Sequence, residues 1–175
     1  AGSLGVDTGA RLALFREQLA AMPVTGRKPL PAKNVRWLQL NPRHDVLFNG
    51  GDRLLRPLYA PDSVQVLGDV PAPCQLPVAP DLRVREAVAA CLSDRRLLPD
   101  EVYLIAPDMQ VIRVETALWN RGDNPGLMPG ARILVPFRGL AARSGNPAAD
   151  TDLAAWLATQ PVIPEVAPAA AEVQP

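Results

Sequence analysis

The segment Ser63-Val64-Gln65-Val66-Leu67-Gly68-Asp69-Val70, followed by Pro71-Ala72-Pro73, decides the fold of this chain. Successive side chains of a strand point to opposite faces, so the alternation predicts a strand with two distinct faces. One face carries Val64, Val66, Gly68 and Val70, and the other carries Gln65, Leu67 and Asp69. The two prolines force a turn, and residues 74–78 are predicted to return as the second strand of a hairpin.

The chain downstream of this hairpin reads as one helix and three more strands. Asp81 is predicted to cap a helix with an apolar face of Val84, Val88, Cys91 and Leu92. Two β-rich runs at 102–106 and 111–116 flank Pro107-Asp108 at hairpin distance, and 132–137 reads as a last strand. One helix over a mixed sheet in this order predicts an α+β fold, namely a β-grasp or a closely related α+β roll.

The chain upstream of residue 63 reads differently. A helix is predicted over residues 8–22, with Asp7 or Thr8 as its N-cap and an apolar stripe of Leu12, Phe15, Leu19 and Met22. Prolines punctuate residues 23–62, so the short apolar runs at 35–40 and 54–58 favour short strands and loops over helices.

An internal repeat supports two modules. Gly51 to Leu58 and Gly130 to Phe137 share one pattern: Gly, a small or acidic residue, Arg, two aliphatic residues, any residue, Pro and an apolar residue. Each copy is predicted to be the last strand of a small module, with Gly in the preceding turn and Pro ending the ladder.

The domain prediction follows from this repeat. Residues 1–60 form a helix and the remainder of a first β-grasp module, 61–140 a complete β-grasp domain, 141–160 a linker and a C-terminal amphipathic helix, and 161–175 a flexible tail rich in Pro and Ala. The alternative makes residues 8–60 a helical and looped extension that packs on a single β-grasp domain.

Composition limits the classes of function. The 18 basic and 18 acidic residues cancel, so bulk charge does not attract nucleic acid or an anionic membrane surface. No run reaches the roughly 20 apolar residues that span a bilayer. With one histidine, His44, and no spacing typical of zinc sites, no metal or other cofactor is expected. Cys74 and Cys91 could form a disulfide in an oxidising compartment, but two small buried apolar side chains are the favoured interpretation.

Several segments, in order and spacing, resemble the GfcC-like capsule biosynthesis family. They are Met22-Pro23-Val24-Thr25-Gly26-Arg27, Asn41-Pro42, Gly51-Asp52-Arg53-Leu54, residues 61–70, Trp119-Asn120 and residues 129–137. The resemblance implies two β-grasp (SLBB-like) domains similar to the periplasmic domains of Wza-type polysaccharide exporters, followed by a C-terminal amphipathic helix. It also implies a periplasmic protein, exported through a signal that is absent from this sequence, that assists capsule or exopolysaccharide assembly.

Three residues are candidates for ligand binding. Arg27 matches the Thr-Gly-Arg motif of the family, and its guanidinium could bind an anionic or hydroxyl-rich sugar; the favoured alternative is an arginine that ties the helix to the sheet. Trp119 could stack on a sugar ring while Asn120 bonds to hydroxyls. The favoured alternative packs Trp119 at the sheet edge and places Asn120 in a turn.

Asp152 is predicted to cap the C-terminal helix, on which Leu153, Trp156 and Leu157 share one face. This face could dock on a partner or on the membrane surface, but docking within the chain is favoured because the stripe is short and lacks Lys or Arg.

The sequence therefore predicts a non-catalytic periplasmic accessory protein for capsule or exopolysaccharide assembly and export. Its partners would be the export machinery or the nascent polysaccharide. The alternative is a polysaccharide hydrolase that uses a pair of carboxylates in a cleft near Arg27. A pocket formed jointly by Arg27 and Trp119 would instead define a sugar binder.

Overall fold

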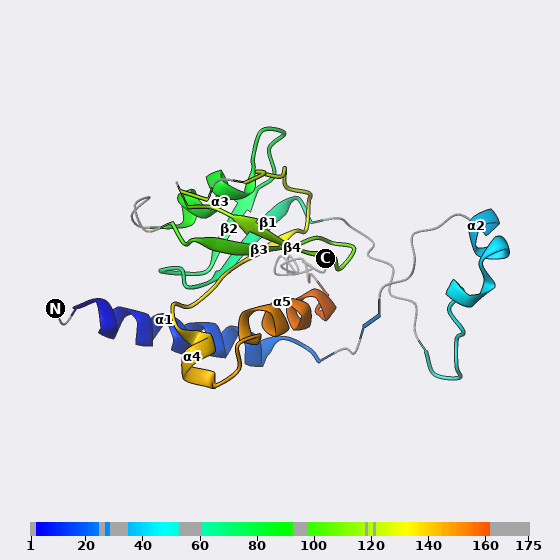
Figure 1. Cartoon of the computed structure of the whole chain (residues 1–175), viewed down its shortest axis with the longest axis horizontal. Helices are drawn as coiled ribbons and strands as arrows, with labels where there is room; N and C mark the ends of the chain where they lie inside the picture. The colour runs from blue at the N-terminus through cyan, green and yellow to red at the C-terminus, as the bar shows by residue number, and fades with distance from the viewer. Residues whose placement is uncertain are drawn as a thin grey trace, which may run out of the picture.

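The computed structural model describes residues 3–24, 27–28, 35–52, 61–92, 98–117, 119–120 and 122–161. In chain order the elements are α1 (Ser3–Ala21), α2 (Val35–Leu40), η1 (Pro42–His44), β1 (Ser63–Gly68), β2 (Cys74–Pro77), α3 (Val84–Cys91), β3 (Glu101–Ile105), β4 (Val111–Glu115), β5 (Arg132–Val135), α4 (Leu140–Ser144) and α5 (Ala149–Thr159). Figure 1 shows a sheet between two helical layers, with α2 set apart from it.

The five strands form one sheet in the order β2-β1-β5-β3-β4. Two antiparallel hairpins, β1 with β2 and β3 with β4, form its outer parts. The last strand, β5, inserts between them, parallel to β1 and antiparallel to β3. The predicted hairpins and last strand are therefore confirmed, and the fold is a mixed α+β arrangement.

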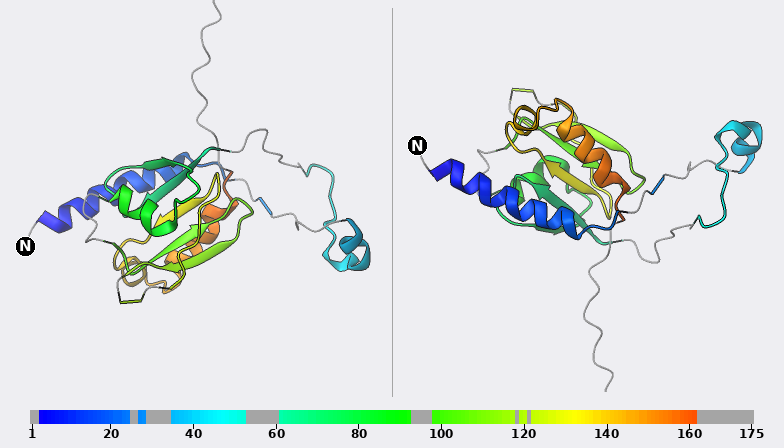
Figure 2. Two further views of the ribbon diagram at one scale, coloured as in Figure 1. Left: turned by 90° about the horizontal axis from the view of Figure 1, so that it is seen from above. Right: turned by 90° about the horizontal axis from the view of Figure 1, so that it is seen from below.

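Each face of the sheet has its own hydrophobic core. Val64, Val66 and Val70 point to the face covered by α3, where Val84, Val88 and Cys91 are buried. Leu67 points to the opposite face, which α1 and α5 cover side by side (Figure 2). The predicted alternation in residues 63–70 is confirmed, and the second face is also covered, with Leu67 buried there.

The apolar stripe of α1 is confirmed as well. Phe15 is buried against Phe137 of the sheet, with ring centroids 5.5 Å apart. The other stripe residues pack around this pair: Leu12, Leu19 and Met22.

The predicted N-caps are wrong. Asp7 and Thr8 lie inside α1, which begins at Ser3. The N-cap of α3 is Arg83 rather than Asp81, and α5 begins at Ala149, three residues before Asp152. The nearest Asp or Thr in the sequence therefore does not mark where the backbone enters these helices.

Residues 35–40 are helical, so the prediction of a strand or loop there is wrong. None of the α2 residues is buried, and α2 runs directly into η1. Residues 53–60, which hold most of the first repeat copy, and residues 162–175 lie outside the described residues. The predicted first module and the C-terminal tail therefore stay predictions.

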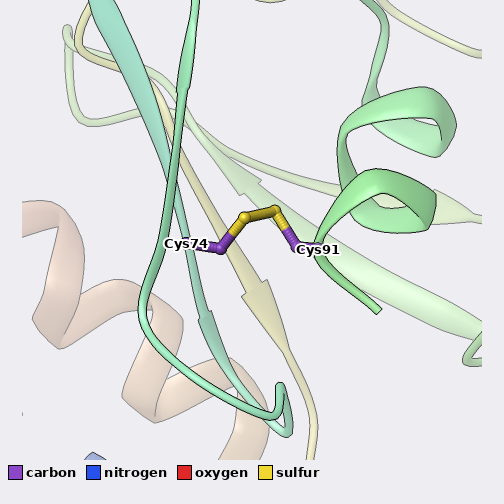
Figure 3. The surroundings of a disulfide bond; sticks show 2 residues. All are labelled: Cys74 and Cys91. Carbon is purple, nitrogen blue, oxygen red and sulfur yellow. A yellow bond between two sulfur atoms is a disulfide. The ribbon is translucent and has the colours of Figure 1, made fainter. Parts of the chain in front are cut away.

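A disulfide joins Cys74 of β2 to Cys91 of α3 (Figure 3). The Cα atoms are 5.7 Å apart, within the range that a disulfide bridges. The favoured interpretation of two separate buried thiols is therefore wrong. Both residues do face the core, but the turn at 71–73 brings the edge strand over the last turn of the helix.

Candidate functional site

The C-terminal end of α5 rests on a buried arginine from the sheet. Arg132 is the first residue of β5, and only 4% of its surface is exposed. Its Nη1 donates to the carbonyl oxygens of Leu157 (3.1 Å) and Gln160 (3.0 Å), and its Nη2 donates to that of Pro161 (2.7 Å). A helix leaves its last carbonyls without intrahelical partners, so one guanidinium stabilises the whole terminus.

A second arginine reaches the same terminus from a distant part of the chain. Nη2 of Arg27 donates to the carbonyl oxygens of Ala158 (2.9 Å) and Gln160 (3.3 Å). Arg27 lies beyond the end of α1, so these bonds tie the segment after α1 to the end of α5. A structural role, in which Arg27 ties neighbouring elements together, was the favoured alternative for this residue, and these bonds agree with it.

The two guanidiniums have no carboxylate partner among the described residues. The remaining bond of Arg132 runs from Nε to the amide oxygen Oε1 of Gln65 (3.3 Å). This acceptor is uncharged, like the backbone carbonyl oxygens that accept the other bonds. Burial, and then the positive charge of Arg27, lower the pKa of Arg132 to about 10; burial also lowers the pKa of Arg27. The negative end of the α5 dipole is therefore the main compensation for two nearby positive charges.

Arg27 keeps donors that the protein does not use. Both described bonds of Arg27 are made by Nη2, so Nη1 has no acceptor among the described residues; Nε also has none but is buried. A half-buried guanidinium with unused N-H groups can bind a carboxylate or a hydroxyl-rich group. The end of α5 is therefore the first candidate site.

Sequence reasoning missed Arg132. A signal was present, because this arginine stands inside the apolar run Ala131-Arg132-Ile133-Leu134-Val135 of a central strand. A charged residue in such a run needs several hydrogen bonds within the protein.

Trp119 and Asn120 form a second candidate site. They follow β4, where the amide Nδ2 of Asn120 donates to the carbonyl oxygen of Asp100 (3.1 Å). Trp119 is 77% exposed, so the favoured interpretation, a Trp packed at the sheet edge, is wrong. The expected turn role of Asn120 agrees with its bond to the backbone.

The two candidate sites do not form one pocket. Arg27 lies with Arg132, which pairs with Ile105 at the last residue of β3. Asn120 contacts Asp100, which precedes the first residue of the same strand. The jointly formed pocket of Arg27 and Trp119 is therefore absent, because the length of β3 separates the two residues.

The predicted docking face of α5 lies against the chain's own sheet. Leu157 has no exposed surface, and Leu153 and Trp156 are partly buried beside it. They pack with Tyr103 and Leu134 from the central strands. Within the described structure this face is occupied, so a partner would meet the opposite face of α5 or would have to displace the helix.

The acidic residues do not gather around Arg27. No carboxylate contacts Arg27 among the described residues, so the pair that the hydrolase hypothesis requires near Arg27 is not found there. Asp150 at the other end of α5 has a raised pKa, caused by burial and then by the charge of Glu101. Glu101 is itself held by an ion pair with Arg113. In the described part of the chain, no group of three or more His, Cys, Asp or Glu residues is placed to hold a metal ion.

These observations define an α+β domain that carries a disulfide, a two-arginine cluster at a helix end and an exposed tryptophan. None of its described helices has the length and apolar character needed to cross a membrane.

Comparison with protein families identifies the chain more narrowly. Residues 77–161, just under half of the chain, match the family described as "Capsule biosynthesis GfcC C-terminal". This match confirms the resemblance to the GfcC-like capsule biosynthesis family seen in the sequence. The match indicates a role in capsule assembly, and the family description names no reaction. A search of curated proteins found no match.

Proposed function

We propose that this protein is a non-catalytic accessory protein that acts in the periplasm during capsule or exopolysaccharide assembly and export. It would act by binding the export machinery or the nascent polysaccharide. The observation that carries the proposal is the family match over residues 77–161. This range includes α3, three of the five strands and α5 with its arginine-bound terminus, so the elements that build the first candidate site are largely inside it.

The disulfide supports the periplasmic part of the proposal. Disulfides persist in oxidising compartments such as the bacterial periplasm and are rare in the cytoplasm. The bond between Cys74 and Cys91 joins the β1–β2 hairpin to α3, beside the hydrophobic core that lies between α3 and the sheet. In a reducing compartment the two thiols would not form this bond.

The sheet topology supports a β-grasp fold for residues 61–140. A hairpin, a helix, a second hairpin and a central last strand parallel to the first are the parts that such a module requires. The helix α3 covers one face of the sheet, as the helix of a β-grasp roll does. We extend the proposal to the partial first module in residues 1–60 and the helical segment in 141–160.

Binding of an acidic group is the role that we propose for Arg27. The guanidiniums of Arg27 and Arg132 place two positive charges at one helix end without a described carboxylate, and Arg27 keeps unused donors. An acidic sugar of the polysaccharide, or a carboxylate of a partner, would supply the missing negative charge.

Crosslinking in intact cells tests the proposal. An epitope-tagged chain, expressed from its own gene, should be released with the periplasmic fraction and should be recovered with a component of the polysaccharide machinery or with the polysaccharide itself. The variant Arg27→Gln should recover less of this partner, while Arg113→Gln, an exposed arginine of β4, should recover as much as the wild type. Recovery of the tagged chain in the cytoplasmic fraction would contradict the proposal.

A further inference from the structure

The exposed ring of Trp119 is the largest aromatic surface that the described sheet region offers to solvent. Tryptophan is usually highly buried, because its indole contributes much of the hydrophobic stabilisation of a core. The other two tryptophans, Trp37 and Trp156, are each partly covered. An indole left 77% exposed costs solvation free energy and contributes little to folding.

The segment that carries Trp119 is anchored at its start. The carbonyl oxygen of Asp100 accepts hydrogen bonds from the backbone N-H groups of Thr116 (3.0 Å) and Ala117 (3.4 Å) and from Nδ2 of Asn120 (3.1 Å). The hydroxyl of Thr116, which is fully buried, donates to the carbonyl of Pro99. The backbone of Thr116 and Ala117 and the side chain of Asn120 are therefore tied to the residues that precede β3.

The continuation of the same loop is anchored to α3. Nη2 of Arg85 donates to the carbonyl oxygens of Gly122 (2.6 Å) and Glu115 (3.0 Å). The side chain of Asn124 accepts from the backbone N-H of Arg85 (3.1 Å) and donates to Oε2 of Glu86 (2.9 Å). These bonds anchor the described parts of the loop while the indole of Trp119 stays exposed.

The residues around this loop favour a sugar over a protein surface as the occupant. The exposed side chains that flank Trp119 or anchor its loop are charged or polar: Arg83, Glu86, Glu115 and Asp123. A protein interface core is depleted in charge and clusters several apolar anchors, whereas one ring amid charged and amide groups suits a ligand with an apolar face and many hydroxyls. The pyranose ring has this chemistry.

We propose that Trp119 is a stacking platform for a pyranose unit of a polysaccharide, with the C-H face of the sugar lying on the indole ring. Asn120 is a positioning residue rather than a ligand contact, because its Nδ2 bonds to Asp100 and its Oδ1 is buried. A tryptophan side chain has only two rotatable bonds, so it loses little conformational entropy on binding, which suits a site that must hold one sugar of a long chain. The inference rests on the proposed function, which places the protein beside a polysaccharide.

The test follows the three indole N-H resonances of the full chain by NMR, one for each tryptophan. The probes are hexasaccharides of glucose, galactose and mannose at millimolar concentration. At least one probe should shift the Trp119 resonance progressively, and the resonance of Trp156, which lies on α5 and is partly buried against the sheet, should stay in place. The variant Trp119→Phe assigns the resonance and should retain part of the binding.

Substitutions distinguish the contribution of the Trp119 ring to sugar binding from that of other exposed side chains. Trp119→Ala should weaken binding about tenfold or more, since it removes the whole stacking surface. Met128→Ala removes another exposed apolar side chain and should bind as the wild type does. Asn120→Ala should weaken binding less than Trp119→Ala and should increase the fast motion of the Trp119 indole in relaxation measurements, which a direct ligand contact would not do.

Two results would overturn the inference. The first is a Trp119 resonance that does not shift with any of the three hexasaccharides. If Trp119→Ala then abolishes crosslinking to a periplasmic protein, the ring contacts a protein and not a sugar. The second is equal affinity of Trp119→Ala and the wild type for a probe that does bind. Neither result would touch the proposed accessory function, which is decided by location and by the partner recovered from cells.

Discussion

Removal of the disulfide between Cys74 and Cys91 has a calculable effect on stability. The two cysteines are 17 positions apart, and closing a loop of this length lowers the entropy of the unfolded chain by an amount worth about 3 kcal/mol at 25 °C. The double variant Cys74→Ala/Cys91→Ala should therefore unfold with about 3 kcal/mol less free energy than the oxidised wild type. For a chain of this size the melting temperature should fall by about 10 °C.

Urea unfolding, followed by far-UV circular dichroism, measures this difference. The reduced wild type is the matched control, because it loses the bond but keeps both side chains; it should unfold close to the double variant. A free energy of unfolding within about 1 kcal/mol of the oxidised wild type would refute the reasoning. It would mean that residual structure already restrains the unfolded chain, or that the bond strains the native fold.

Three other predictions address the packing and charges of the fold. Leu157→Ala should destabilise the protein by about 2–5 kcal/mol, because it opens a cavity between α5 and the sheet; urea unfolding checks this. Gly68→Ala should destabilise the protein severely, because the new Cβ would lie 2.1 Å from the carbonyl oxygen of Val135. Gly9→Ala, in open space on α1, should stabilise the protein by up to about 1 kcal/mol. Thermal melts of the two variants, run side by side, compare these effects. Asp150→Asn should stabilise the protein near neutral pH, because the raised pKa means that the fold disfavours the ionised carboxylate. The gain should vanish as the pH falls below the unfolded pKa, when Asp150 is protonated in both states, and a gain that persists in urea unfolding at acidic pH would contradict this assignment.

The sheet was predictable because its signals are local. The valine alternation, the paired prolines and the two β-rich runs around Pro107-Asp108 each fix a short piece of backbone. The order of the strands within the sheet was not predicted, because the pairing of β5 with β1 and β3 joins segments that are distant in the sequence.

The failures share a different origin. Residues 35–40 contain Trp37 and three aliphatic residues, which fit a strand as well as a helix, and α2 buries none of them to decide between the two. The disulfide depends on the 5.7 Å approach of two Cα atoms from separate elements. Spacing along the chain carries no record of that distance.

The candidate sites divide in the same way. Arg27 was identified by its motif, but its partners at Ala158 and Gln160 come from the far end of the chain. The exposure of Trp119 also depends on tertiary structure, because Asn120 and Arg85 hold the loop outward instead of letting the ring pack at the sheet edge. The neighbouring residues in the sequence suggested what Arg27 and Trp119 could bind, but they did not show which side chain is exposed to solvent.

Deletion of the gene in the bacterium that encodes this protein tests the account most directly. The quantity to measure is the polysaccharide at the cell surface, by amount and by chain length, with the deletion complemented by the wild-type gene. An accessory role in assembly and export predicts that surface polysaccharide falls sharply in the deletion strain and returns on complementation. Surface polysaccharide of unchanged amount and length would contradict it.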